Sequence, residues 1–309
     1  MIKNLINRLL QGVVVLFVLF TVTFFLVKKM PGGPFQTEKA IPAHIKARIE
    51  AYYGLDQPVE VQYYRQLTNY LKGDPGLSLR MEGCPVTEII GQAFPVSLQL
   101  GIVAMAIALV IGIPAGCVAA AKKNGLLDSG SMAFAMIGIC LPAFVIGPIL
   151  AEVFGRVLHW FPAMGWSSTS PQTWVLPAIT LGLVTAAYLS RLTRAGMIET
   201  LSQDFVRTAK AKGVPGWKIL IRHCLRGGLI PAVAYIGPAF AGIISGSVVI
   251  ETIFQIPGLG RHFIKAIETR DAPVITGAVL LYGSLVIVAN LLTDLAGLWL
   301  NPRLRSGKN

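Results

Sequence analysis

Charged side chains are scarce in this sequence of 309 residues. Lys, Arg, Asp and Glu make up 14% of the chain, whereas hydrophobic residues make up 54%. Soluble domains carry about 25% charged residues, and disordered chains have low hydrophobicity. The composition therefore excludes a disordered chain and argues against a soluble globule. The net charge of +12 would suggest nucleic acid on its own, but the mean hydropathy of +0.64 argues against that partner.

Patterns that bind metals or perform catalysis are also missing. The four Cys and four His show neither metal-ligand spacing nor a disulfide framework. The sequence contains no H-E-x-x-H or G-x-S-x-G protease motif and no G-x-x-x-x-G-K-[ST] loop to cradle the phosphates of ATP. We expect no enzyme activity, no metal and no cofactor in this chain. A pump built from it must take its energy from another subunit.

Six long runs without charged residues are present instead. They cover residues 9–27, 89–121, 129–151, 157–190, 227–250 and 272–293. A helix needs about 20 apolar residues to cross the hydrocarbon core of a membrane, and each run supplies that length. The runs do not alternate between apolar and polar residues, which favours helices over a β-barrel. The sequence predicts an all-α integral membrane protein with six transmembrane helices.

The predicted spans can be given approximate bounds. They are 9–29, 93–121, 130–155, 173–190, 229–251 and 273–297. Residues 30–92 are expected to form a small extracytoplasmic cap, in which 45–53 and 59–72 have the pattern of short amphipathic helices. The first run is longer than the roughly 7–15 residues of a signal-peptide core and ends without a cleavage site, which indicates an uncleaved span. The remaining segments are 1–8, 122–129, 156–172, 191–228, 252–272 and 298–309.

The distribution of basic residues predicts the orientation. With the N-terminus inside, the cytoplasmic segments hold 15 Lys and Arg against three acidic residues, and the outer segments hold 12 against 11. Cytoplasmic loops carry the excess of Lys and Arg in membrane proteins. Lys28 and Lys29, at the outer end of the first span, oppose this rule locally. We expect both termini to lie in the cytoplasm.

The middle of every span lacks Asp, Glu, Lys and Arg. Ion-coupled carriers often keep such residues in the membrane, and a voltage sensor needs Arg there. Their absence argues against an ion-coupled carrier and against a voltage sensor. A stand-alone secondary carrier or channel remains the alternative to a driven pump. Prolines in the spans are consistent with the broken helices that line transporter pathways, and equally with kinks for packing.

Small residues recur in two of the spans. Gly112-xxx-Gly116 and Gly242-xxx-Gly246 fit the small-residue pattern of helix contacts. Ser245 and Ser247, next to the second pair, are our candidates for lining a translocation pathway, with helix packing as the alternative.

The segment 191–228 is the longest cytoplasmic piece and holds eight basic residues. A helical stretch over 204–212 ends at Gly213, which tolerates the left-handed backbone of a helix end, and a second helix is expected over 217–225. Two helices joined by a glycine turn should project from the bilayer. On this pattern alone the segment would lie on anionic lipid or receive a partner protein, with equal weight.

Two motifs are specific enough to suggest a family. The first is Arg207-Thr208-Ala209-xxx-Gly213, and the second is Glu251-Thr252-Ile253-Phe254-xx-Pro257-Gly258-Leu259-Gly260. Shorter strings are found at 30–35, 54–58, 73–78, 94–97 and 301–303. Together they resemble the dipeptide/oligopeptide permease family of ABC importer membrane subunits, whose "EAA" loop corresponds to the first motif. Arg207 and Thr208 replace the Glu-Ala of other branches. The outer connection at 156–173 is short, which makes the chain more similar to the oligopeptide type than to the dipeptide type.

The resemblance implies a type I ABC importer permease fold with its core at about 93–297, in the inner membrane of a bacterial cell. This subunit would pair with a second, homologous permease subunit. Two ATP-binding subunits would dock inside and hold ATP and Mg, and an extracytoplasmic binding protein would deliver oligopeptides outside. Dipeptides, nickel or another small solute are the alternative cargo.

The resemblance also assigns residues. The expected ATPase-coupling positions are Asp204, Phe205, Arg207, Thr208, Ala209, Lys210, Ala211, Lys212 and Gly213. Phe205 would fill an apolar slot on the ATPase, and the basic residues would meet acidic side chains. The motif at the outer end of the fifth span supplies Glu251, Phe254, Pro257, Gly258 and Gly260, with Glu251 expected to be structural.

Overall fold

A computed structural model of the chain describes residues 2–30, 54–81 and 83–300. The predicted cap helix at 45–53, the string at 301–303 and most of the string at 30–35 lie outside these residues. Within the described ranges the chain is helical, without a strand and with one isolated bridge between Leu77 and Pro85. The expected all-α fold class is confirmed.

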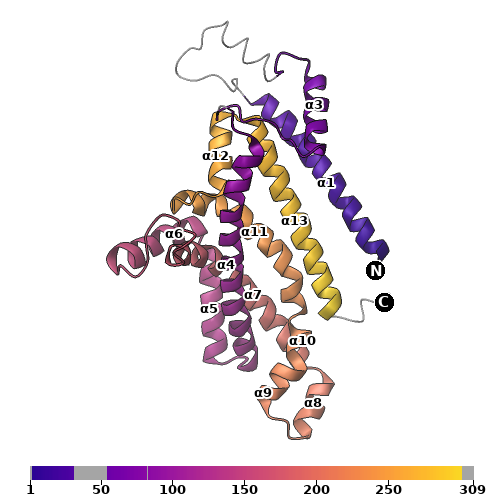
Figure 1. Ribbon diagram of the computed structural model, residues 1–309. Coiled ribbons are helices and arrows are strands. Elements are labelled where there is room, and N and C mark those ends of the chain that lie inside the picture. Colours follow the sequence, from indigo (N-terminus) through magenta and orange to yellow (C-terminus); the bar gives the residue numbers. More distant parts are fainter. Residues whose placement is uncertain (1, 31–53, 82, 301–309) are drawn as a thin grey trace.

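Among the residues that the structure describes, five helices are long and apolar enough to cross a membrane. They are α1 (Ile2–Lys29), α4 (Val86–Ala121), α7 (Gln172–Leu201), α11 (Ile230–Ile253) and α13 (Ala272–Leu300). Each overlaps one predicted span, and together they form the bundle in Figure 1. α7 continues beyond the expected end of its span at 190, so that Arg191 and Arg194 belong to the same uninterrupted helix.

The expected third span, 130–155, is not one straight helix. α5 (Leu126–Cys140) is followed by α6 (Ala143–Leu150), which continues into the π-helical turn η1 (Ala151–Val157). The chain bends by 102° between α5 and the combined segment of α6 and η1. Pro142 explains the bend because it lacks an N–H group and holds Leu141 in an extended conformation (ψ 118°). In Figure 1, α6 projects sideways from the bundle. By length and composition, this bent pair adds a sixth span to the five long helices only if its two parts cross the membrane as one.

The contact between α4 and α7 is the most extensive contact between two helices. Glycines make it close, because a Cβ atom at Gly112 would lie 2.6 Å from the carbonyl oxygen of Ala186, and one at Gly116 would lie 2.5 Å from that of Ser190. The first predicted glycine pair is thus confirmed as a helix contact. Gly242 and Gly246 meet nothing within 4 Å, so the second pair makes no such contact with the described residues.

The main apolar core lies where α4, α7 and α11 meet. Its buried side chains include Leu100, Leu176, Leu181, Ile243 and Phe254. Burying such side chains contributes roughly 1.5–3 kcal/mol each relative to leaving them in water. In a membrane, tight packing rather than water exclusion holds such helices together.

The described part of the cap rests on α1. Helix α3 (Val59–Leu71) lies beside the outer half of α1 in Figure 1. Tyr63 packs edge-on against Phe24, with ring centroids 5.3 Å apart, and its hydroxyl lies 2.8 Å from that of Thr21. Phe20 packs against Tyr63 and Tyr70 at 5.5 Å. The aromatic cluster fixes α3 to the membrane helix.

A buried carboxylate joins the cap to α13. Asp271 directly precedes α13 and is only 3% exposed. It accepts hydrogen bonds from the Ser78 hydroxyl and from the Leu79 N–H, the latter at 3.1 Å. Arg80 adds a bond from Nε to the Thr269 carbonyl oxygen at 3.2 Å. The segment after α3 is thus tied to the outer end of the last span.

Two ion pairs tie helices together at the opposite end. Arg194 on α7 donates from Nε and Nη2 to the two carboxylate oxygens of Asp128 on α5, at 2.5 and 2.7 Å. The same carboxylate accepts the Asn124 N–H at 2.9 Å, which closes the turn before α5. Arg8 on α1 and Asp294 on α13 approach to 2.9 Å. The bidentate Arg194–Asp128 pair has the stronger geometry.

We expect Gly112→Ala to destabilise the protein by about 2 kcal/mol, because the added methyl overlaps the backbone of α7. Gly130→Ala in α5 is the matched control, because a Cβ atom there meets nothing within 4 Å. Thermal unfolding in detergent would measure both variants. Equal midpoints for the two would contradict the close α4–α7 contact.

Candidate functional site

The segment 191–228 contains the predicted helix, glycine turn and second helical stretch. Its elements are α8 (Asp204–Ala211), α9 (Gly216–Lys218), the π-helical turn η2 (Ile219–Cys224) and α10 (Leu225–Gly228). Gly213 has φ 74°, and its N–H donates to the Lys210 carbonyl oxygen at 2.9 Å. The Val214 N–H donates to the Ala209 carbonyl oxygen at 3.2 Å. These two bonds define a Schellman ending, which explains a glycine at 213.

One face of α8 is buried and holds the helix in place. Val206 and Ala209 pack against Ile219 and Cys224 of η2 and against Met197 of α7. Burial raises the pKa of the Cys224 thiol, more than the nearby Lys210 charge lowers it, so the thiol stays protonated. Ala209, which the family motif assigned to coupling, therefore lies on the buried face of α8 and not on its exposed face.

The other face of α8 is exposed at the tip of the molecule, beyond the ends of the long helices in Figure 1. Phe205 is 43% exposed despite being a large apolar side chain. Further exposed positions are Asp204, Arg207, Thr208, Lys210, Ala211, Lys212 and Gly213. Arg207 contacts Asp204 at 3.3 Å within the same helix, and an exposed pair of this kind contributes little to stability. The surface combines one aromatic ring with three cations.

Two further apolar side chains extend this surface, and the sequence interpretation missed them. Trp217 is 63% exposed and Ile221 is 58% exposed, both on the second helical stretch. Lys218 Nζ lies 5.5 Å from the centre of the Trp217 ring. An exposed aromatic residue at the tip of a loop is a signal for protein contact, and Trp217 beside Gly216 carries that signal in the sequence.

A crevice of about 510 Å³ opens behind Phe205. Phe205 forms part of its wall together with Glu199 from the end of α7 and His223 from η2. Phe205 was expected to fill an apolar slot on the ATPase. In this chain the same side chain also lines a crevice of its own. Both features belong to one surface at the end of α7.

One face of α11 is exposed along its length, and small residues dominate it. It carries Ala234, Pro238, Gly242, Ser245, Val249 and Thr252. Ser245 lies on this face and donates to the Ala241 carbonyl oxygen of its own helix at 2.9 Å. Ser247 does not lie there, because it is fully buried. Of the two predicted pathway serines, the structure leaves only Ser245 on an exposed face.

Glu251, near the end of α11, is 0% exposed. Its Oε1 accepts hydrogen bonds from the hydroxyls of Ser97 on α4 at 2.7 Å and Ser247 at 2.8 Å. Its Oε2 accepts the Arg261 N–H at 3.2 Å, in the first turn of α12 (Leu259–Thr269). Ser97 in turn accepts the Leu259 N–H at 2.8 Å. Glu251 therefore accepts hydrogen bonds from residues of three helices, α4, α11 and α12.

The rest of this motif makes room for the carboxylate. A Cβ atom at Gly258 would overlap the Glu251 carboxylate, and one at Gly260 would lie 2.6 Å from the Cα atom of Val248. Phe254 is fully buried, and its carbonyl oxygen accepts the Gly165 N–H at 2.8 Å. The motif thus turns the chain sharply from α11 into α12 around a buried acid.

The described residues hold no group of three or more His, Cys, Asp or Glu suited to a metal ion. His262, the fourth residue of α12, is the nearest histidine to Glu251 in sequence. Burial lowers its pKa, and the charges of Lys265 and Arg261 lower it further, against the opposing effect of Glu251. The imidazole is therefore neutral near pH 7.

Comparison with known families decides the identity of the chain. Residues 112–306 match the family described as "Binding-protein-dependent transport system inner membrane component", and residues 1–101 match its N-terminal companion. The chain belongs to this family. It is a membrane-embedded permease subunit of an ABC importer and not an enzyme, because ATP hydrolysis takes place in separate subunits of such transporters. Membership implies ATP-binding subunits, a permease partner and a binding protein.

Named relatives cover the whole chain. The oligopeptide transport system permease protein OppB of Haemophilus influenzae is 41% identical over 305 residues, which is 99% of this chain and 100% of that protein. OppB of Escherichia coli K12 is 39% identical over the same shares. The dipeptide transport system permease protein DppB of Bacillus subtilis is 39% identical over 100% of this chain and 99% of that protein.

A solved structure supports the fold. A chain of the MetNI methionine ABC transporter, in inward-facing conformations, superposes with a TM-score of 0.60 at 15% identity. The match covers 69% of this chain and 96% of the other. It confirms the expected type I ABC importer permease fold.

We expect Glu251→Ala to lower the free energy of unfolding by about 3 kcal/mol, because two hydroxyls and a helix-terminal N–H lose their acceptor in a buried site. The free energy of unfolding of Glu251→Gln should fall between those of the wild type and Glu251→Ala. The glutamine amide keeps one acceptor oxygen but turns an NH2 donor toward groups that are themselves donors. Glu268→Ala on the exposed side of α12 is the control. Thermal unfolding in detergent would rank them, and a Glu251→Ala midpoint equal to that of Glu268→Ala would refute the structural role.

Proposed function

We propose that this chain forms half of the translocation pathway of an ATP-driven, binding-protein-dependent importer of oligopeptides. The observation that carries the proposal is similarity over the entire length to permease proteins of oligopeptide transport systems. The specific motifs at 207–213 and 251–260 are both intact. A homologous subunit supplies the other half, and an extracytoplasmic binding protein delivers the peptide.

The coupling step takes place at α8. The ATP-binding subunits dock on the exposed face that contains Phe205, Arg207 and Lys210, and the apolar Trp217 and Ile221 extend the contact. ATP and Mg stay in those subunits, and this chain holds no cofactor. Because Val206 and Ala209 bind α8 to η2 and α7, a displacement of α8 moves the inner end of α7. The differential contacts of the two docked states provide the driving energy.

The pathway runs along the exposed face of α11. Gly242 and Ser245 lie on it at the level of the main core, and no charged side chain interrupts α11 between 230 and 250. Rocking of the two permease halves opens this face alternately to each side, as alternating access requires. Both termini lie in the cytoplasm in this proposal, which the excess of Lys and Arg in the corresponding loops supports.

Dipeptides are the second candidate cargo, because one full-length relative is a dipeptide permease protein. The reconstituted importer with its cognate binding protein would distinguish the two. We expect uptake of labelled tetra- and pentapeptides, with weaker uptake of dipeptides. Uptake of dipeptides alone would favour the second candidate, and uptake without ATP or partner subunits would refute an ABC importer.

Phe205→Ala should reduce peptide uptake and binding-protein-stimulated ATPase activity by about tenfold, because it removes an apolar anchor worth roughly 1.5–3 kcal/mol. Gly213→Pro should have a similar effect by breaking the end of α8. Leu126→Ala provides the control, because Leu126 is an exposed apolar residue at the inner end of α5, outside the docking face. Membrane levels must be matched. Unchanged uptake in both loop variants would refute the coupling role of α8.

A further inference from the structure

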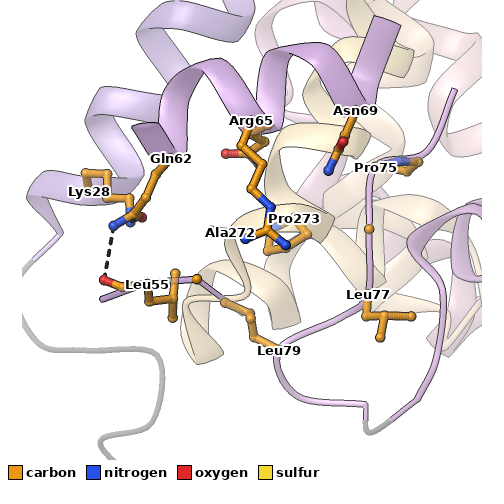
Figure 2. A pocket seen from close by; sticks show the side chains of 13 residues that line it. Lys28, Leu55, Gln62, Arg65, Asn69, Pro75, Leu77, Leu79, Ala272 and Pro273 are labelled. Atoms are coloured by element: carbon orange, nitrogen blue, oxygen red, sulfur yellow. Dashed lines mark hydrogen bonds between the residues drawn. The ribbon is translucent and has the colours of Figure 1, made fainter. Parts of the chain in front are cut away.

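A pocket of about 420 Å³ lies on the outer side of the molecule, away from α8 and from the exposed face of α11. It is lined by helix α3, the end of α1, the start of α13, residues 54–55 and the stretch 75–79. Figure 2 shows Lys28, Gln62, Arg65 and Asn69 around it, with Pro273 on its far side. Neither the coupling motif nor the motif around Glu251 accounts for this hollow.

The lining of the pocket is positively charged. Lys28 and Arg65 contribute two cations, and the described lining contains no Asp or Glu. No ion pair between either cation and a carboxylate is found among the residues that the structure describes. Gln62, Gln66 and Asn69 add side-chain amides that can donate hydrogen bonds. The composition suits an anion with several acceptor oxygens.

Lys28 is held in position before any ligand arrives, and the chain leaves room for the Arg65 side chain. Lys28 Nζ donates to Gln62 Oε1, while Gln62 Nε2 donates to the carbonyl oxygens of Leu55 at 3.0 Å and Gln57 at 2.7 Å. Gly54 has φ 67°, and a Cβ atom at this position would overlap Nη1 of Arg65. A glycine at 54 thus leaves space for the guanidinium group. Prepositioned donors reduce the entropy lost on binding.

The surroundings place this charge beside lipid. Lys28 follows the exposed apolar residues Val22, Phe25 and Leu26 at the end of a long apolar helix. Tyr64 and Leu71 on α3 are exposed as well. Basic residues at the end of a transmembrane helix lie at the level of the lipid headgroups. The pocket therefore opens where phosphate groups of the outer leaflet are concentrated.

We propose that this pocket is a binding site for a phosphate group, carried by the headgroup of an anionic phospholipid or by a soluble phosphate. Arg65 binds two phosphate oxygens with its planar fork, and Lys28 binds as a point charge. The amides of Gln66 and Asn69 take the remaining acceptors. Occupation of the site joins α3 to α1 and α13 at the outer surface.

The test uses the full importer complex in nanodiscs of phosphatidylcholine with a small fraction of phosphatidylglycerol. Native mass spectrometry after detergent extraction would count retained phosphatidylglycerol in the wild type, Lys28→Gln and Arg65→Gln. Lys29→Gln is the matched control, because it removes the same charge one residue away and does not line the pocket. Size-exclusion chromatography confirms assembly, and a parallel arm measures binding of inorganic phosphate in pure phosphatidylcholine.

We expect Arg65→Gln and Lys28→Gln to weaken retention by about tenfold, with Lys29→Gln close to the wild type. Retention that excess inorganic phosphate does not displace assigns the site to lipid. Phosphate binding in neutral lipid that is lost in Arg65→Gln assigns it to the soluble anion. Equal retention in all variants, or an equal loss in Lys29→Gln, would overturn the proposal, as would the absence of binding in both arms.

Discussion

The close approach of α4 and α7 is the contact on which the rest of this structure depends. Gly112 and Gly116 bring the two backbones together, and α7 then continues without a break to Leu201. About 30 residues of helix extend roughly 45 Å. One continuous helix therefore reaches from Gln172 to the residues that pack against the buried face of α8. A displacement of α8 is therefore transmitted along α7 to the middle of the bundle.

The buried acids follow one rule, which the membrane imposes. Polar groups in an apolar environment must find partners within the protein. Glu251, Asp271 and Asp128 each lie near a helix end and accept backbone N–H groups as well as side-chain donors. Each also joins segments far apart in the sequence. The chain thus keeps its ionisable residues out of the helix centres and uses them to hold helix ends together.

Composition and local pattern predicted much of this, and failed where a tertiary partner decides. Charge-free runs gave the spans, and Gly213 gave the end of α8. Pro142 lies at the break between α5 and α6, whereas Pro177 lies inside the continuous helix α7. The sequence cannot separate these two outcomes, because the packing around each proline decides whether the helix continues. The two glycine pairs have identical spacing and opposite surroundings. Ser245 and Ser247 are two positions apart and therefore face different directions, and the sequence did not say which faces the core.

The exposed face of α11 has a consequence for selectivity. A face made mostly of alanine, glycine, serine and proline, with one valine and one threonine, offers few shape differences and no charge with which to distinguish one peptide side chain from another. If the proposed pathway follows this face, the route cannot act as a sieve for residue identity. Discrimination must then take place before entry, in whichever protein captures the cargo, and the membrane subunit can remain indifferent to its sequence.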